Sequence, residues 1–284
     1  MKRGFPILAI TTALLLSFAL YEALIAAPTE QTMGNVQRIF YYHVPSAWTA
    51  FLLFFVNFLA SVQYLVRRAK VPAQQIATWV VILIVIAACI AGFVAPLPVG
   101  ITAGAVATSA VTILASYFLI GKYFSGDKLD VLALTTAEVG VVFCTVVLVT
   151  GPIWARPVWG IWWTWDLRLT LTLVLWLIYV SYLFLRRFST SGQTPVLAAV
   201  VAIFGALDVP LVYFSIWFFR TQHPSPVIGG GGSLDPRMAH VLLINWAAFL
   251  SLAFLLCWTR YQLELVKREI EEAQAHESLL EGTK

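Results

Sequence analysis

The sequence predicts an all-α fold: a polytopic membrane bundle of about eight spanning helices. Two observations support this. Hydrophobic residues make up 60% of the chain and charged residues only 11%, whereas a soluble domain carries roughly 25% charged residues. The apolar residues also form runs of about 20, the length that a helix needs to cross ~30 Å of hydrocarbon. These features exclude a water-soluble globular domain.

Each expected span is one such apolar run. The fourth run is rich in small residues, which favour close packing between helices. In chain order the runs are Ile7–Ala27, Ala47–Val66, Ile76–Val94, Thr102–Gly121, Leu129–Val149, Leu169–Leu185, Val196–Ile216 and Ala239–Trp258.

Positive charges sort the connections between these runs into two groups. Lys and Arg gather at the amino end, in the second, fourth and sixth connections and in the tail, and this bias places both termini in the cytoplasm. The net charge of +4 follows from that bias and does not indicate a nucleic-acid partner. The opposite side of the membrane then carries three long loops, residues 28–46, 150–168 and 218–238.

The two ends of the chain predict one membrane domain followed by a tail. The first apolar run is longer than the core of a signal peptide and other spans follow it, so we expect it to stay uncleaved. Residues 1–259 form the membrane domain and residues 260–284 a charged, helical cytoplasmic tail. The three cysteines match no metal or disulfide spacing, and the chain has no nucleotide-binding motif.

The external loop 150–168 is exceptionally rich in tryptophan. A membrane-interface belt spreads its tryptophans over many helix ends, whereas here they lie in one loop that Gly151, Pro152 and Pro157 are expected to break and stiffen. Such a cluster predicts an aromatic wall for a large, planar, apolar ligand. Its members are Trp154, Trp159, Trp162, Trp163 and Trp165.

Two charged residues close this loop at the head of the next span. Asp166 and Arg168 are placed to pair with each other, to cap the following helix, or to hold a polar group of a ligand. The sequence leaves these three alternatives open.

The other two external loops each contain a histidine close to a proline and to aromatic residues. His43 lies in "RIFYYHVPSAW" and His223 in "FFRTQHPSP". Histidine is an axial ligand of haem iron, and two histidines can hold the iron from opposite faces. The three loops together therefore predict an external haem site with two histidine ligands and a tryptophan platform.

Further along the third loop, Asp235 and Pro236 predict the start of the last helix, with Asp235 as its cap. His240 lies about one turn later, without aromatic neighbours, and is either a supporting residue or a competing ligand. Three acids, Glu22, Glu138 and Asp208, fall in or near apolar runs, where they pair between helices or serve function.

The segment "WGIWWTWDLRLT" resembles the WWD motif of the haem-handling proteins of c-type cytochrome biogenesis, the CcmC, CcmF and CcsA families. The resemblance is strongest to the CcmC family, haem exporter protein C. In this sequence Asp166 is followed by Leu-Arg-Leu-Thr, as in CcmC, whereas CcmF- and CcsA-like proteins usually have a proline there. The segments "YHVPSAW", "PLVYFSIWFFRTQH" and "SLDPRM" are also similar to its histidine regions.

This resemblance implies a function and a set of partners. Haem b would be held at the outer face of the bacterial inner membrane, with His43 and His223 as axial ligands and the tryptophans, Asp166 and Arg168 around them. It would be loaded onto the periplasmic chaperone CcmE, alongside a CcmA/CcmB ABC transporter and CcmD. The resemblance indicates haem transfer rather than an enzyme. Because CcmC has six spans, it also implies that residues 71–128 contain an inserted helix pair.

Four alternatives compete with this interpretation. A transmembrane haem exporter would favour histidine pairs within the spans, and a CcsA- or CcmF-type haem–apocytochrome c synthase would favour a proline after Asp166. A b-type electron carrier would place facing histidines on spanning helices. A structural subunit would use its tryptophans only as a membrane anchor and would be colourless.

Overall fold

The computed structural model describes residues 4–70, 72, 75, 79, 99–219, 221–224 and 234–281. These residues are helical apart from connections and one isolated bridge between Glu30 and Gly34. The elements are α1 (Gly4–Tyr21), the π-helix η1 (Glu22–Ala26), the 3-10 helix η2 (Asn35–Ile39), α2 (Phe40–Arg68), α4 (Val99–Tyr123), α5 (Asp127–Trp159), α6 (Leu167–Phe188), α7 (Thr194–Phe218) and α8 (Pro236–Glu281).

Six helices in the described part of the chain are long and apolar enough to cross a membrane. They are α1 with η1, α2 with η2, α5, α6, α7 and α8, and each contains one expected apolar run, except that the first run extends one residue beyond η1. Helix α4 covers the fourth run. The third run lies outside the described residues except for Trp79, so the total of eight spans remains a prediction.

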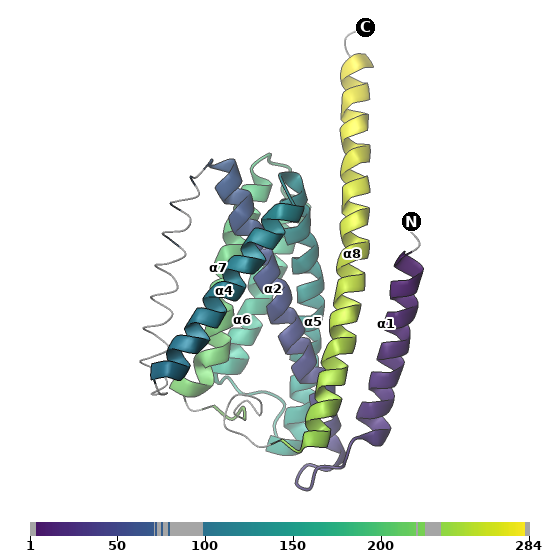
Figure 1. The fold of residues 1–284 in the computed structure, drawn as a ribbon, viewed down its shortest axis with the longest axis vertical. Coiled ribbons are helices and arrows are strands. Elements are labelled where there is room, and N and C mark those ends of the chain that lie inside the picture. The colour runs from purple at the N-terminus through teal and green to yellow at the C-terminus, as the bar shows by residue number, and fades with distance from the viewer. Residues whose placement is uncertain are drawn as a thin grey trace.

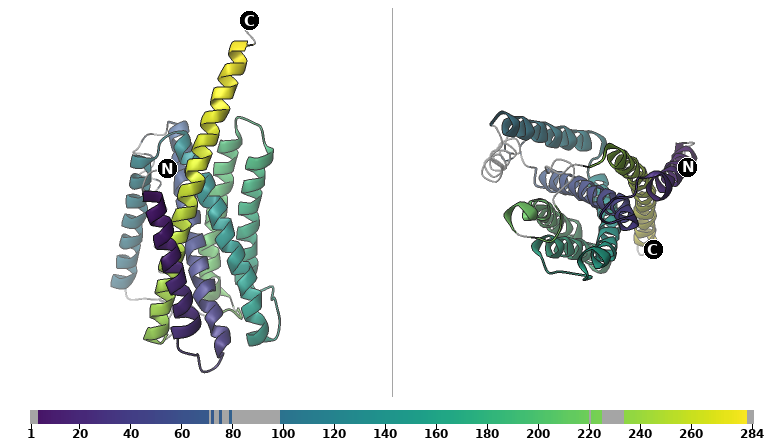
Figure 2. Two further views of the ribbon diagram at one scale, coloured as in Figure 1. Left: turned by 90° about the vertical axis from the view of Figure 1, so that its right-hand side faces the viewer. Right: turned by 90° about the horizontal axis from the view of Figure 1, so that it is seen from below.

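Helix α2 occupies the centre of the bundle, as the view from below in Figure 2 shows. It packs against α4, α5, α7 and α8, while α6 packs between α5 and α7 and α1 packs along α8. The start of α1 and the end of α8 lie at the same end of the bundle, beyond which α8 extends (Figure 1). The loops that precede α2 and α6, and the described residues before α8, lie at the opposite end (Figure 1).

Aromatic side chains pack closely between α2, α5 and α6. The ring of Phe54 stacks on that of Tyr179, with centroids 3.8 Å apart and planes 9° apart. A Cβ atom at Gly140 would lie 2.6 Å from Cε1 of Phe54. Only glycine therefore lets α5 approach this ring, in the way that small residues bring membrane helices together.

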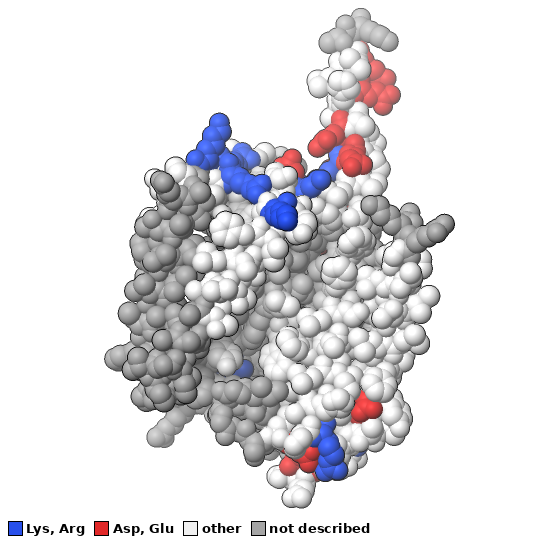
Figure 3. Space-filling view, viewed as in Figure 1, with Lys and Arg blue, Asp and Glu red and all other residues white. Residues whose placement is uncertain are grey.

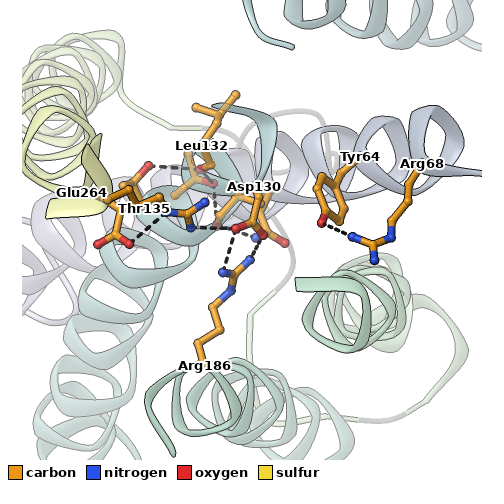
Figure 4. A network of polar contacts seen from close by, with 11 residues as sticks. Tyr64, Arg68, Asp130, Leu132, Thr135, Arg186 and Glu264 are labelled. Carbon is orange, nitrogen blue, oxygen red and sulfur yellow. Dashed lines mark hydrogen bonds and ion pairs between the residues drawn. The ribbon is translucent and has the colours of Figure 1, made fainter. Parts of the chain in front are cut away.

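On the face shown in Figure 3, the charged side chains of the described residues lie mainly at the two ends of the bundle, with an almost uncharged band between them. At the end that carries the termini, Asp130 of α5 accepts hydrogen bonds from Arg186 of α6 and Arg268 of α8 (Figure 4). Asp130 is 2% exposed, so the pair of guanidinium groups compensates a carboxylate that has lost its water. These contacts fasten the base of the α8 extension.

The acid Glu138 belongs to the same end of the structure. Its carboxylate accepts a hydrogen bond from Arg260 of α8 at 3.0 Å, and Arg260 also contacts Glu264 at 3.1 Å. Of the two roles expected for Glu138, the structure supports pairing between helices.

Helix α5 corrects one prediction from the sequence. Gly151, Pro152 and Pro157 were expected to end the helix and open a loop, but α5 continues through them to Trp159. Proline is tolerated in a membrane helix where neighbouring helices and side chains compensate the lost backbone bond. The loop itself is therefore short, and Gly160, with φ of +79°, ends the helix in a left-handed conformation that glycine adopts without strain.

Candidate functional site

A deep cavity opens at the end of the bundle opposite the termini, between α2, α5, α6 and α7. Its cavity volume is about 240 Å³, just below the roughly 300–1,000 Å³ that pockets for small organic ligands usually span. Most of the lining is apolar. Its polar groups include His43, Arg168, Thr172, Gln222 and His223.

His43 lies in the first turn of α2 rather than in a loop, because η2 runs directly into that helix. Arg38 fixes the entry by donating hydrogen bonds to the backbone carbonyls of Ala23 (2.7 Å) and Ala27 (3.3 Å). The ring of His43 is 8% exposed and meets Trp154 edge to face at 5.9 Å. Its Nδ1 lies 2.9 Å from Oγ1 of Thr150 on α5.

His223 reaches the same cavity from the segment that follows α7. Its Nδ1 lies 2.9 Å from the carbonyl oxygen of Pro224, and because a carbonyl only accepts, Nδ1 carries the hydrogen and Nε2 keeps a lone pair. Its backbone N–H donates to Oγ1 of Thr221 at 2.8 Å. Burial, with a smaller effect from the Arg168 guanidinium, lowers the pKa of His223 to about 4, so the ring is neutral at neutral pH.

Asp166 and Arg168 have separate roles. Asp166 is the N-cap of α6, since its carboxylate accepts the backbone N–H of Leu169 at 3.0 Å, which satisfies a free donor of the first turn. Arg168 instead lines the cavity. Its Nη1 is buried and has no hydrogen-bond partner among the described residues. Of the alternatives left open by the sequence, capping therefore applies to Asp166, and no ion pair joins these two in the described part of the chain.

The tryptophan cluster divides into two groups. Trp154, Trp159 and Trp163 line the cavity, and the indole Nε1 atoms of Trp154 and Trp163 are buried without a partner among the described residues. Trp162 and Trp165 face outward, with 59% and 76% of their surfaces exposed. The expected single wall of five tryptophans is therefore an inner group of three and an outer pair.

Several residues of the cavity were not expected from the sequence. Cys144, Val147 and Gly151 of α5 and Val212 of α7 line it, as does Met33 before η2. The residues on α5 follow the three- and four-residue spacing of one helix face. The same face continues through Trp154, Ala155 and Val158 because the helix extends past Pro152.

Other predicted neighbours lie elsewhere. Two aromatic residues near His43 in the sequence do not line the cavity: Trp48 packs edge to face on Trp246 at 5.2 Å and Tyr41 is buried in the core. His240 and Glu22 share a separate hollow between η1 and α8, so His240 is not part of the cavity. Asp235 caps α8 through a 2.8 Å bond from the N–H of Arg237, as predicted.

The fold and the cavity define a helical membrane protein with a two-histidine pocket at one end of its bundle. Comparison with known sequences identifies the family within this class. The model of the CcmC family, described as "Heme exporter protein C", matches residues 75–276. The chain belongs to this family, whose members act in cytochrome c biogenesis.

Individual relatives agree with the family match. The chain is 28% identical to "Heme exporter protein C" of Bradyrhizobium diazoefficiens over 275 residues, which cover 96% of this chain and 82% of the relative. It is 26% identical to a putative ccmC-like mitochondrial protein of cytochrome c biosynthesis from Marchantia polymorpha, over 83% of this chain and 76% of that one. Against "Heme exporter protein C" of Haemophilus influenzae it is 33% identical, over 48% of this chain and 56% of the relative.

Proposed function

We propose that the chain holds haem b in this cavity at the outer face of the bacterial inner membrane and delivers it to a periplasmic haem chaperone of the CcmE type. The observation that carries the proposal is the meeting of His43 and His223 in one apolar cavity. They come from opposite parts of the chain, and axial ligation by two histidines is an established way to hold haem iron.

The unpartnered polar atoms of the cavity fit the same ligand. Nη1 of Arg168 and the Nε1 atoms of Trp154 and Trp163 are buried donors without partners among the described residues, and such atoms in a native structure call for an explanation, such as a missing ligand. Haem offers two carboxylates and a flat apolar ring. Arg168 is suited to bind a carboxylate, and Trp154, Trp159 and Trp163 to contact the ring.

The outer tryptophans fit the delivery step. Trp162 and Trp165 are exposed beside the cavity-lining Trp159 and Trp163, and aromatic side chains are enriched where proteins bind one another. We assign this pair, with Asp166 fixing the start of α6, to the contact with the chaperone. The CcmA/CcmB transporter and CcmD are the expected further partners of the same assembly.

Haem export through the bilayer is the alternative that the family's description raises. The chain has four histidines, of which His43, His223 and His240 lie at the outer end of the bundle and His276 in the α8 extension. None is at mid-membrane depth, where a path across the bilayer would need ligands. This distribution favours presentation at the outer face.

The test is the absorption spectrum of the protein purified from haem-replete cells, with His43→Ala, His223→Ala and, as a matched control, His276→Ala. We expect the low-spin spectrum of two histidine ligands in the wild type and the control, and its loss or alteration in the other two variants. Imidazole added to His43→Ala should restore it. A well-folded wild type that binds no added haem would refute the proposal.

Delivery is tested separately by mixing the haem-loaded protein with the haem-free chaperone. Haem should move to the chaperone, and Trp162→Ala with Trp165→Ala should slow this transfer without changing the spectrum of the loaded protein. Transfer at the wild-type rate in the double variant would overturn the assignment of the outer pair.

A further inference from the structure

Thr150 of α5 makes a polar contact with the His43 ring, and the hydrogen of its hydroxyl group is already used in another hydrogen bond. The Oγ1 hydroxyl of Thr150 donates to the backbone carbonyl of Val146, one turn earlier, at 2.7 Å. A second carbonyl, that of Val147, lies at 3.4 Å. A hydroxyl has one hydrogen and two lone pairs, so Oγ1 offers His43 a lone pair.

The direction of the bond between Thr150 and His43 follows from this. With the hydroxyl hydrogen on Val146, the 2.9 Å contact is a hydrogen bond from Nδ1–H of His43 to Oγ1. A neutral imidazole carries its hydrogen on one nitrogen only. Nε2 of His43 therefore keeps its lone pair, which is what a metal ligand needs.

The surroundings of the ring restrict its position further. Trp154 meets it edge to face at 5.9 Å, and a Cβ atom at Gly151 would lie 3.5 Å from its Cε1. The ring thus rests on one turn of α5 with Thr150, Gly151 and Trp154 around it. Thr150 makes the only hydrogen bond to this ring among the described residues.

We propose that Thr150 is a positioning residue for haem binding, which holds His43 as the Nδ1–H tautomer and presents Nε2 to the iron. This rests on the proposed function. The carbonyl of Pro224 has the same effect on His223, whose Nδ1 lies 2.9 Å from it. A metal-binding histidine commonly donates its second N–H to an oxygen, and loss of that partner typically weakens metal binding by 10- to 100-fold.

The first experiment needs no haem. The chain has four histidines, so ¹⁵N-histidine labelling gives few signals, and His43→Ala assigns the one of interest. We expect the Nδ1–H form for His43 in the wild type and in Thr150→Ser, which keeps the hydroxyl. In Thr150→Val, which has the same shape without it, the other tautomer should become populated.

The matched control is Thr145→Val on the same helix. Thr145 also donates to the carbonyl one turn earlier, that of Val141, at 2.7 Å, and also accepts from an aromatic ring N–H, that of Trp176, at 2.8 Å. It lies outside the cavity. This control reports what the loss of such a hydroxyl does to α5 itself, and the His43 tautomer should be unchanged in it.

The second experiment measures ferric haem dissociation into excess apomyoglobin, together with the absorption spectrum. Thr150→Val should lose haem roughly 10- to 100-fold faster and gain high-spin character, while Thr150→Ser and Thr145→Val stay close to the wild type. In a His43→Ala background Thr150→Val should add nothing, because Thr150 acts through His43.

The outcomes separate the two proposals. If the wild type binds no haem, the proposed function fails, whatever the tautomer. If the wild type binds haem through His43 but Thr150→Val keeps both its tautomer and its dissociation rate, only the role of Thr150 is overturned. A Thr150→Val effect that persists without His43 would make Thr150 a structural residue and overturn its role as well.

Discussion

Replacing Arg168 by leucine should weaken haem binding without destabilising the haem-free protein. Its Nη1 is buried with no partner among the described residues, and burying an unsatisfied polar group costs about 1–3 kcal/mol. Arg168→Leu should therefore leave the free energy of unfolding of the haem-free protein unchanged or raise it by about that amount. A hydrogen bond to a charged group contributes about 1.5–3 kcal/mol, so haem affinity should fall roughly 10- to 150-fold.

The assay for Arg168→Leu combines thermal unfolding of the haem-free protein in detergent with haem titration. Arg187→Leu is the control, because Arg187 is an exposed arginine at the other end of α6 and should leave haem affinity unaltered. The reasoning fails if Arg168→Leu destabilises the haem-free protein by more than about 2 kcal/mol and keeps its affinity. Arg168 would then be a structural cation with a partner of its own.

Three further predictions test the frame around the site. Asp130→Asn should lower the free energy of unfolding by about 3–5 kcal/mol, because it leaves the buried guanidinium of Arg186 without its carboxylate. Glu271→Gln, in an ion pair exposed by more than half, should lower it by less than about 1 kcal/mol; similar unfolding midpoints for both variants would contradict this. Asp166→Ala should lower the free energy of unfolding by about 0.5–2 kcal/mol through loss of the N-cap. A changed haem spectrum in this variant would show instead that Asp166 contacts the haem directly. Burial lowers the pKa of His223 to about 4, whereas its ordinary pKa is about 6.5, so between these two pH values the unfolded chain binds more protons than the folded one. Stability therefore decreases as the pH is lowered through this range. His223→Gln should lessen the decrease in unfolding midpoint from pH 7 to 5, and His276→Gln should not.

Most of the fold could be predicted because the length of an apolar run indicates a membrane helix. Each run of about 20 apolar residues, such as Val196–Ile216, lies in a helix wherever the structure describes it. The ends were less predictable, as α5 shows. Pro152 and Pro157 stop most soluble helices, and only the packing of neighbouring helices, which a sequence does not display, lets α5 continue to Trp159.

The two histidines of the candidate site could be predicted from residue type and context, but the residues that hold them in position could not. His43 and His223 stand out beside proline and aromatic residues, and both reach the cavity. Thr150 stands where an apolar run meets the loop 150–168, and nothing in the sequence shows that α5 brings it to His43 across the bundle. The division of the tryptophans into inner and outer groups likewise depends on the turn after Trp159, where Gly160 reverses the chain.

The two histidines are tethered very differently, and this has a kinetic consequence. His43 is tied to a second helix through Thr150, whereas among the described residues the hydrogen bonds of His223 reach only Thr221 and Pro224 in its own segment. Withdrawing His43 requires two packed helices to separate, while His223 can leave together with its neighbours. We therefore expect release in an ordered sequence, in which His223 departs first and an incoming ligand takes its side of the iron while His43 still holds the other.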